Sequence, residues 1–459
     1  MFSLKAGPEA DVRPETPEER IIWFSITATY LFYLVGGLYV LAPVLAWSLV
    51  MRAAWLHLKG RQRFPRLPWP LWVWIIGMIV MEFSLLAGHL IENLGTGKLI
   101  KSSIGWAKGW ALLAVFPIIG CLAIRPAVII RAAMHVCLHT MLLLPVFVGA
   151  WLAGLPQVPF VSPLQAIGGP GPEFFAVSLY EIDPGSGMPR WRLFTPWAPA
   201  VGFVASIYFA CALLEKHPLW KAIGIGGSVL MILMSGSRMA LVSLVLISAG
   251  MFLLKRLHKP WLWFSFSGVS LIGGFLGAPI LEAIDNFIAA FKGSRADSTR
   301  VRAALGRIAV DRWRNEAPWF GHGIVERGPH LVEYMPIGSH HSWYGLLFVK
   351  GIFGLFALLV PMLVSLLHLL RFVVGRPVVQ LGLIMVGLLF VYSFGENLEI
   401  LAYLIWPGLI LIGKAHQLAG LPASEGHIHN MGPVDVEKPS SRTAAAPPSA
   451  DTGSSDTAT

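Results

Sequence analysis

The sequence is poor in charge and in cysteine. Charged residues make up 13% of its 459 positions, whereas soluble domains carry roughly 25%. This shortage excludes an ordinary cytosolic enzyme, which needs a charged surface, and the apolar content described below excludes a disordered protein. The three cysteines all lie inside apolar runs, which excludes a disulfide framework and a Cys-x-x-Cys metal site.

Apolar residues are abundant instead. They make up 55% of the chain, and the mean hydropathy is +0.66. This composition predicts an all-α polytopic membrane protein. The first 20 residues mix acidic and basic side chains and lack both a basic segment and an Ala-x-Ala site, so we expect no cleaved signal peptide.

Eleven apolar runs are candidate membrane spans, since a helix needs about 20 apolar residues to cross a bilayer. The first run contains Gly36-Gly37 and Pro43 and is long for one helix but short for two. A hairpin there would raise the number of spans to twelve. The runs are 22–50, 71–93, 104–124, 127–153, 197–214, 219–236, 239–254, 260–281, 342–370, 378–395 and 397–413.

Basic residues mark every alternate connection, as the positive-inside rule expects of cytoplasmic loops. The net charge of +10 therefore reports topology rather than nucleic-acid binding. Eleven spans would place the amino terminus outside, and twelve would place both termini in the cytoplasm; the sequence leaves both open. The basic connections lie at 52–66, 125–131, 216–221, 255–259, 371–376 and 414.

We expect three parts: a polar amino-terminal segment at 1–20, a helical bundle at 21–413 and a disordered cytoplasmic tail at 414–459 that is rich in Ser, Thr, Ala and Pro. Two long connections, 154–196 and 282–341, fall on the non-cytoplasmic side of the bundle. Connections of this length are usually functional or disordered.

The second long connection is rich in arginine. Between 294 and 330 there are seven arginines and no lysine, and guanidinium groups bind phosphate or carboxylate in a bidentate way that lysine cannot match. The helical period predicts an amphipathic helix at 299–314 on the membrane surface, with its apolar side down. The alternative is a solvated face whose arginines pair with nearby acids. The apolar side would comprise Val301, Ala304, Leu305 and Ile308, and the arginines are 295, 300, 302, 307, 312, 314 and 327.

Further basic groups are predicted at the same outer face. Arg238, in Gly-Ser-Arg-Met-Ala at 236–240, lies between two spans, where an arginine has a polar partner or an anionic ligand or else extends to the interface. Arg190 and Arg192 precede the fifth span on this side.

A histidine motif, Gly-Ser-His-His-Ser-Trp-Tyr-Gly, stands at 338–345, just before the ninth span. A histidine at such a junction can accept a proton from a hydroxyl near neutral pH. Its alternative role is to anchor the chain at the interface together with Trp343 and Tyr344.

Taken in order, these motifs resemble a known family. Arg238 in Ser-Arg-x-Ala, an outer loop, Pro318-x-x-Gly321-x-Gly323, the histidine motif and Gly351-Ile-Phe-Gly354 look like the O-antigen ligase/polymerase superfamily. The resemblance covers roughly 190–413. It implies a GT-C-like bundle of about 11–12 helices in the bacterial inner membrane, with a long periplasmic loop and an active face open to the periplasm. The implied donor is a polyprenyl-diphosphate-linked glycan.

The resemblance also implies roles for particular residues. Arg238, together with Arg302 or Arg300, would hold the donor diphosphate, and we add Arg192 to this group. His340 or His341 would activate the acceptor hydroxyl: the usual spacing to Gly351 selects His340, whereas a His-Ser variant of the motif selects His341.

The chemistry suits these residue types. A sugar diphosphate carries a good leaving group, so catalysis needs positive charge for the departing diphosphate and a base for the hydroxyl. No Asp-x-Asp motif occurs, and we expect no metal and no cofactor. We hypothesise a displacement with inversion at the anomeric carbon.

Three other polar positions could contact acceptor glycan. Glu82 and His89 share one face of the second span, and Glu396 lies at the outer mouth before the last span. The alternatives are a satisfied structural network for the first two and plain loop solvation for Glu396.

Several functions remain open at this stage. A ligase would use a glycolipid acceptor such as lipid A–core, and a polymerase would use another lipid-linked repeat. A transporter of lipid-linked oligosaccharide or of anions is a more distant alternative, because transporters favour internal repeats and charges at the membrane midplane. A non-catalytic scaffold is the last.

Overall fold

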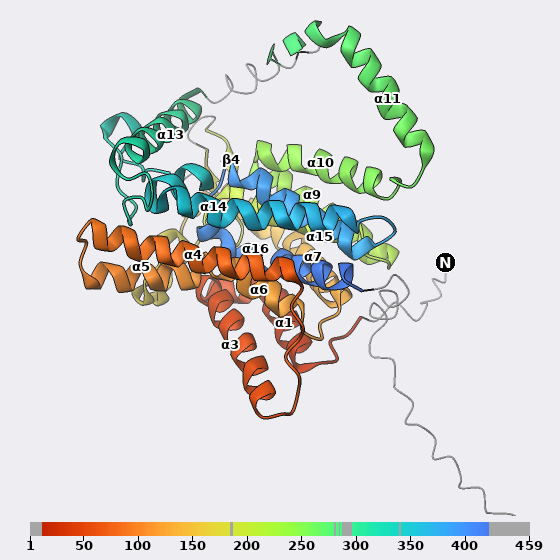
Figure 1. The fold of residues 1–459 in the computed structure, drawn as a ribbon, viewed down its shortest axis with the longest axis horizontal. Coiled ribbons are helices and arrows are strands. Elements are labelled where there is room, and N and C mark those ends of the chain that lie inside the picture. Colours follow the sequence, from red (N-terminus) through yellow and green to blue (C-terminus); the bar gives the residue numbers. More distant parts are fainter. Residues whose placement is uncertain are drawn as a thin grey trace, which may run out of the picture.

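The computed structural model describes residues 12–183, 187–279, 281–283, 285–286, 296–338 and 341–421, and these fold as a bundle of helices (Figure 1). In the described part, seven helices are long and apolar enough to cross a bilayer, and α11 (Pro260–Phe275) with the helical residues after it, at an angle of 88°, adds an eighth if the two form one span. Three further apolar helices are shorter. The predicted all-α polytopic fold is confirmed.

The first apolar run is a hairpin. It comprises α1 (Pro17–Thr27), α2 (Thr29–Leu34) and α3 (Leu38–Leu58), and it turns at Gly36, which has a φ of +68°. A Cβ at Gly36 would lie 2.2 Å from the Cβ of Ser162, so the turn packs tightly on the first long connection. Of the two alternatives for this run, the hairpin is the one observed.

The later helices follow the predicted spans closely, with breaks within the third. They are α4 (Trp69–Ile91), α5 (Thr96–Lys108), α6 (Leu112–Gly120), α7 (Pro126–Leu152), α8 (Ala198–Ala212), α9 (Pro218–Ser235), α10 (Arg238–Leu254), α11 (Pro260–Phe275), α13 (Ala296–Glu316), α14 (Ser342–Arg371), α15 (Pro377–Ser393) and α16 (Leu398–Ala419).

The bundle has two distinct ends. The basic end carries the connections at 59–66, 216–217 and 372–376, and the loop end carries 154–183 and 317–338. Every helix that starts at the basic end has proline at its first or second position, namely α1, α4, α7, α9, α11 and α15. Proline there costs no hydrogen bond and presets the helical φ.

The first long connection is only sparsely ordered into strands. Antiparallel pairs form between β1 (Phe160–Val161) and β2 (Ala176–Val177) and between β3 (Glu181–Ile182) and β4 (Pro189–Arg190). The short helices η1 (Pro163–Ile167) and η2 (Pro172–Phe174) lie between β1 and β2, and η3 (His330–Val332) lies in the second connection.

α16 forms the centre of the bundle. It packs against α6, α14 and α15, and almost all of its side chains are buried. The helix continues to Ala419, past the point where we placed the start of the tail, and Lys414 donates a hydrogen bond from Nζ to the carbonyl of Leu122 at 2.8 Å. The tail beyond residue 421 lies outside the described residues.

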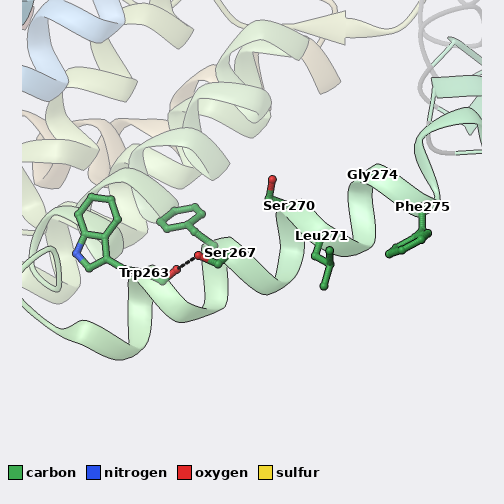
Figure 2. A pocket seen from close by; sticks show the side chains of 7 residues that line it. Trp263, Ser267, Ser270, Leu271, Gly274 and Phe275 are labelled. Carbon is green, nitrogen blue, oxygen red and sulfur yellow. Dashed lines mark hydrogen bonds between the residues drawn. The ribbon is translucent and has the colours of Figure 1, made fainter.

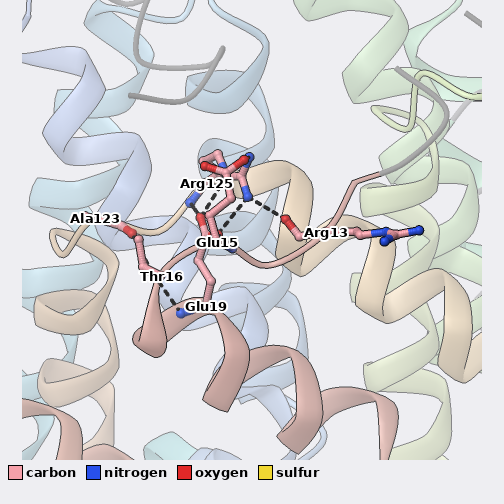
Figure 3. Close-up of polar contacts among 6 residues, drawn as sticks. All are labelled: Arg13, Glu15, Thr16, Glu19, Ala123 and Arg125. Carbon is pink, nitrogen blue, oxygen red and sulfur yellow. Dashed lines mark hydrogen bonds and ion pairs between the residues drawn. The ribbon is translucent and has the colours of Figure 1, made fainter. Parts of the chain in front are cut away.

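A network of ion pairs ties the amino-terminal segment to the basic end (Figure 3). The Arg125 guanidinium donates to both carboxylate oxygens of Glu19, at 2.9 Å and 2.8 Å, and also pairs with Glu15. Its Nη2 reaches the carbonyl of Arg13 at 2.6 Å. The start of α1 therefore lies beside the connection between α6 and α7.

The arginine-rich segment forms the predicted helix, α13, but its apolar side is not turned to the membrane. Val301, Leu305 and Ala309 are buried against Val332, Ile337 and Phe348 of the following segment and α14. The expectation that this apolar side faces the bilayer was wrong, because the protein itself supplies the apolar surface that covers it.

Candidate functional site

The candidate site lies at the loop end, where the amino-terminal ends of α8, α10, α14 and α16 meet around the turn at 394–397. Ser342 joins two of them: its hydroxyl donates to the carbonyl of Glu396 at 2.7 Å and accepts from the Leu398 N–H at 3.0 Å. Helix amino termini carry partial positive charge and favour anions. The arrangement therefore suits a negatively charged ligand.

Glu396 is buried in this turn and is 5% exposed. Its Oε2 accepts a hydrogen bond from the indole N–H of Trp197, the residue that caps α8, at 3.0 Å. Burial raises the pKa of Glu396 to about 7, although the Trp197 bond and the positive charge of Arg302 act in the opposite direction. The sequence reasoning found Glu396 and Arg302 separately, and the structure brings them together.

His341 caps the amino terminus of α14. Its Nδ1 accepts from the Tyr344 N–H at 3.4 Å, and its ring stacks on Tyr344 with centroids 4.0 Å apart and meets Phe394 edge-on at 5.6 Å. Burial lowers the pKa of His341 to about 4, so the imidazole is neutral near pH 7. The other histidine of the motif, His340, lies outside the described residues.

The capping bond fixes a tautomer. A ring nitrogen that accepts a hydrogen bond has no proton, so in this arrangement Nε2 of His341 carries the proton. To accept a proton at Nε2, the ring must move its proton to Nδ1 and give up the capping bond. At 3.4 Å that bond is long, and the cost of losing it is small.

Arg238 begins α10 and is half-buried. A left-handed Gly236 with a φ of +59° ends α9, and Ser237 caps α10, so a tight turn places Arg238 at the loop end. The neighbouring Met239 contacts the candidate site, because a Cβ on Gly395 would lie 2.4 Å from its Cε. Arg238 is thus the neighbour in sequence of a residue that contacts the turn at 394–397.

Arg300 and Arg302 are exposed on α13. Arg302 is close enough to Glu396 for its charge to act on that carboxyl group. The choice between Arg300 and Arg302 for the diphosphate stays a prediction.

Arg192 is buried and binds protein backbone. Its Nη1 donates to the carbonyl of Pro196 at 2.7 Å, and its Nη2 donates to the carbonyl of Ala176 at 3.3 Å. These bonds hold the strand of chain that leads to Trp197. In this structure Arg192 holds the backbone next to Trp197. Its predicted contact with diphosphate stays a prediction.

Glu82 and His89 lie on α4. Both ring nitrogens of His89 have partners, the carbonyl of Leu85 at 2.9 Å and the hydroxyl of Ser102 at 3.0 Å. Glu82 has a buried Oε2 that lacks a hydrogen-bond partner within the described residues, and its charge acts on Lys350. A cavity of about 200 Å³ opens beside His89 and Asn93.

Two of the motifs interlock. α14 breaks at Gly351, which has a φ of +61° and a ψ of −159°, and the break frees backbone groups that a helix would pair. The N–H groups of His322 and Gly323 donate to the carbonyls of Phe348 and Val349 at 2.9 Å. The Ile352 N–H donates to the carbonyl of Pro318 at 3.0 Å. The Pro-x-x-Gly-x-Gly loop therefore supplies hydrogen-bond partners for backbone groups that the break in α14 leaves free.

A larger hollow of about 770 Å³ runs along α11 (Figure 2). All seven residues that line it, among them Trp263, Ser270 and Phe275, belong to α11. Because all of the lining residues come from one helix, the hollow is part of that helix's outer surface. Apolar side chains on the outside of a membrane span face lipid. We assign it no ligand.

A profile of the protein family described as O-Antigen ligase matches residues 223–359. No curated protein matches the chain. The match confirms the predicted resemblance to the O-antigen ligase/polymerase superfamily over this segment, which runs from α9 to α14. It includes Arg238, Arg302 and His341, whereas Arg192 and Glu396 lie outside it.

Proposed function

We propose that this protein transfers a polyprenyl-diphosphate-linked glycan to a hydroxyl of an acceptor glycolipid, as an O-antigen ligase does. The observation that carries the proposal is the meeting of Arg302, Glu396 and His341 at one end of a membrane bundle, on and beside the segment that matches the family. Such a site combines positive charge, helix amino termini, a carboxyl group with a pKa of about 7 and a neutral imidazole that can accept a proton.

In this reaction the acceptor oxygen forms a bond to the anomeric carbon of the donor sugar. The bond between that carbon and the diphosphate oxygen breaks, and polyprenyl diphosphate leaves. Arg238 and Arg302, with Arg300 and Arg192 as further members of the predicted set, would stabilise the leaving charge. The acceptor proton would go to His341, or to His340 beside it, and Glu396 would orient or share that proton. We propose inversion of configuration and no metal.

We further propose that the protein lies in the bacterial inner membrane with its loop end in the periplasm. The basic connections at the opposite end support this orientation through the positive-inside rule. The arginine-rich face and the candidate site would then meet donor glycan that has already crossed the membrane.

The test is the glycan profile of a deletion strain, separated into surface lipopolysaccharide and carrier-linked material. We expect long polymer trapped on the carrier and bare core at the surface, and both should revert when the wild-type protein is returned. Single repeats on core or carrier would instead identify a polymerase of the same superfamily, which is the second candidate. An unchanged profile in both fractions would contradict the proposal and favour a transporter.

A further inference from the structure

His322 stands in the loop that completes the broken helix α14, and the proposed reaction does not use it. It is 5% exposed and packs flat on Phe348, with ring centroids 4.3 Å apart. The loop connects α13, which carries Arg302, to α14, which His341 caps. His322 thus lies between the helix that carries Arg302 and the helix that His341 caps.

Both ring nitrogens of His322 face acceptors. Nδ1 lies 3.0 Å from the carbonyl oxygen of Phe348, and Nε2 lies 2.8 Å from Oε2 of Glu316. A carbonyl oxygen only accepts, so Nδ1 must carry a proton. If Glu316 is ionised, Nε2 must carry one as well, and the ring is then an imidazolium.

Glu316 is held in its ionised form by a second cation. The same Oε2 accepts from Nε of Arg312 at 2.8 Å, and the bonds from Arg312 and His322 lower the pKa of Glu316. Arg312 also donates to Glu326 at 2.5 Å, and its guanidinium lies over the ring of Phe348, 5.1 Å from the ring centroid. Two cations and two carboxylates are therefore balanced around one aromatic ring when His322 is charged.

Several titratable groups lie on the elements packed around His322. α13 contributes Arg312 and Glu316, and the loop contributes Glu326. α4 brings His89 to within 2.9 Å of a Cβ built on Gly323, and α14 brings Lys350 against Gly321 through its backbone. His89 already has both nitrogens occupied. Loss of the His322 proton would leave a lone pair against the Glu316 carboxylate and an uncompensated negative charge.

We propose that His322, as an imidazolium, is a positioning residue that ties the carboxyl-terminal end of α13 to α14 and so holds Arg302 toward the turn at 394–397. The tie is a charge-assisted bond at one end of α13, and the apolar contacts of Val301 and Leu305 fix the rest of the helix. The inference rests on the proposed function only for its activity readout.

The first experiment measures the tie without any activity assay. The full-length protein in lipid nanodiscs, carrying ¹⁵N-labelled histidine, is compared with His322→Gln and with His330→Gln, a control at an exposed histidine of the same connection. We expect the signal that disappears in His322→Gln to be that of an imidazolium at neutral pH. A neutral imidazole signal at that position would overturn the proposal.

The second experiment removes the partner instead of the histidine, which avoids a folding defect at a buried position. Glu316→Gln is compared with Asp311→Asn, which makes the same charge change on α13 outside the tie. Amide exchange in 310–323 should become about tenfold faster in Glu316→Gln and stay unchanged in Asp311→Asn, as expected for loss of a charge-assisted bond. Equal exchange in the two variants would overturn the proposal.

Transfer assays then test whether the bond between His322 and Glu316 contributes to the proposed reaction. Glu316→Gln should lower kcat about tenfold with little change in KM. Normal kcat in Glu316→Gln would overturn the positioning role. A wild-type protein that transfers no glycan would count against the proposed function, while the exchange measurement would still judge the tie.

Discussion

His341 has two roles at the start of α14 that require opposite tautomers: a helix cap that accepts at Nδ1 and a base that accepts at Nε2. Substitution can separate them. Asparagine is a good amino-terminal cap but has no atom at the Nε2 position. We therefore expect His341→Asn and His341→Ala both to lose transfer by roughly 10²–10⁴-fold.

Only His341→Ala should also lose stability, by about 1 kcal/mol. Thermal unfolding of the two variants in detergent, measured beside transfer activity, checks this expectation. Wild-type transfer in His341→Asn would show that this imidazole is not the base and would leave the role to its neighbour in the motif.

Glu396 makes stability depend on pH with a definite sign. Its folded pKa of about 7 exceeds the ordinary value of 4.5 for a glutamate carboxyl group, so between these values the folded state binds more protons than the unfolded state. The free energy of unfolding should then fall as pH rises from about 4.5 to 7, by roughly 3 kcal/mol from this group. His341, whose pKa is lowered, acts in the opposite direction below neutral pH.

We expect Glu396→Gln to lose the part of this pH dependence that Glu396 supplies, because the amide keeps the shape and the Trp197 contact but cannot ionise. Unfolding midpoints at several pH values measure the effect, with Glu92→Gln as a control at an exposed glutamate of the loop end. An unchanged slope in Glu396→Gln would contradict the assignment.

The sequence could identify Glu396, Arg238 and the histidine pair because each interrupts an apolar pattern. A polar group at such a position is costly and is usually functional or paired. It could not identify Trp197 and Ser342. Tryptophan and serine are ordinary residues at helix ends near a membrane, and their roles depend on contacts with Glu396 that span 199 and 54 positions of the chain.

Among the elements, the broken helix α14 depends most on particular residues. A Cβ at Gly351 would lie 2.2 Å from the carbonyl oxygen of Trp319, and its backbone conformation is one that other residues avoid. We expect Gly351→Ala to cost about 1–3 kcal/mol from strain alone and to displace the loop at 317–323. Both losses should appear as a lower Tm and reduced transfer.

Gly226→Ala is the matched control, since Gly226 lies inside α9 with open space around its Cα. Alanine there should stabilise the helix by about 0.5–1 kcal/mol. A Gly351→Ala variant that is as stable as Gly226→Ala would contradict the interlocked arrangement.

The same region limits what periodicity can predict. The spacing of apolar residues gave the α13 helix and its apolar side, but it could not say what covers that side. An amphipathic pattern is the same whether the apolar side faces a bilayer or a neighbouring helix. Only the fold brings Val332 and Phe348 against the apolar side of α13. Likewise, the sequence shows the glycine motifs at 318–323 and 351–354, whereas the hydrogen bonds between them depend on the tertiary structure.

Across the whole molecule, the hairpin at Gly36 decides the topology. If each long helix, each shorter apolar helix, α11 and the α1–α2 pair crosses once, the chain crosses twelve times. An even number places both termini on one side. The contacts of Glu19 with Arg125 and of Lys414 with the carbonyl of Leu122 place α1 and the end of α16 at the same end of the bundle.

Labelling of single cysteines with a membrane-impermeant thiol reagent in intact cells tests this arrangement, because the three native cysteines are buried. Arg13→Cys tests the amino terminus, because the substitution keeps the backbone carbonyl that accepts from Nη2 of Arg125 (Figure 3). With the loop end in the periplasm, we expect labelling at Glu92→Cys and none at Arg13→Cys or Arg61→Cys until the membrane is opened. Labelling of Arg13→Cys but not Arg61→Cys would mean that the first run crosses only once, and the ion pairs between Arg125 and the amino-terminal segment could not then form.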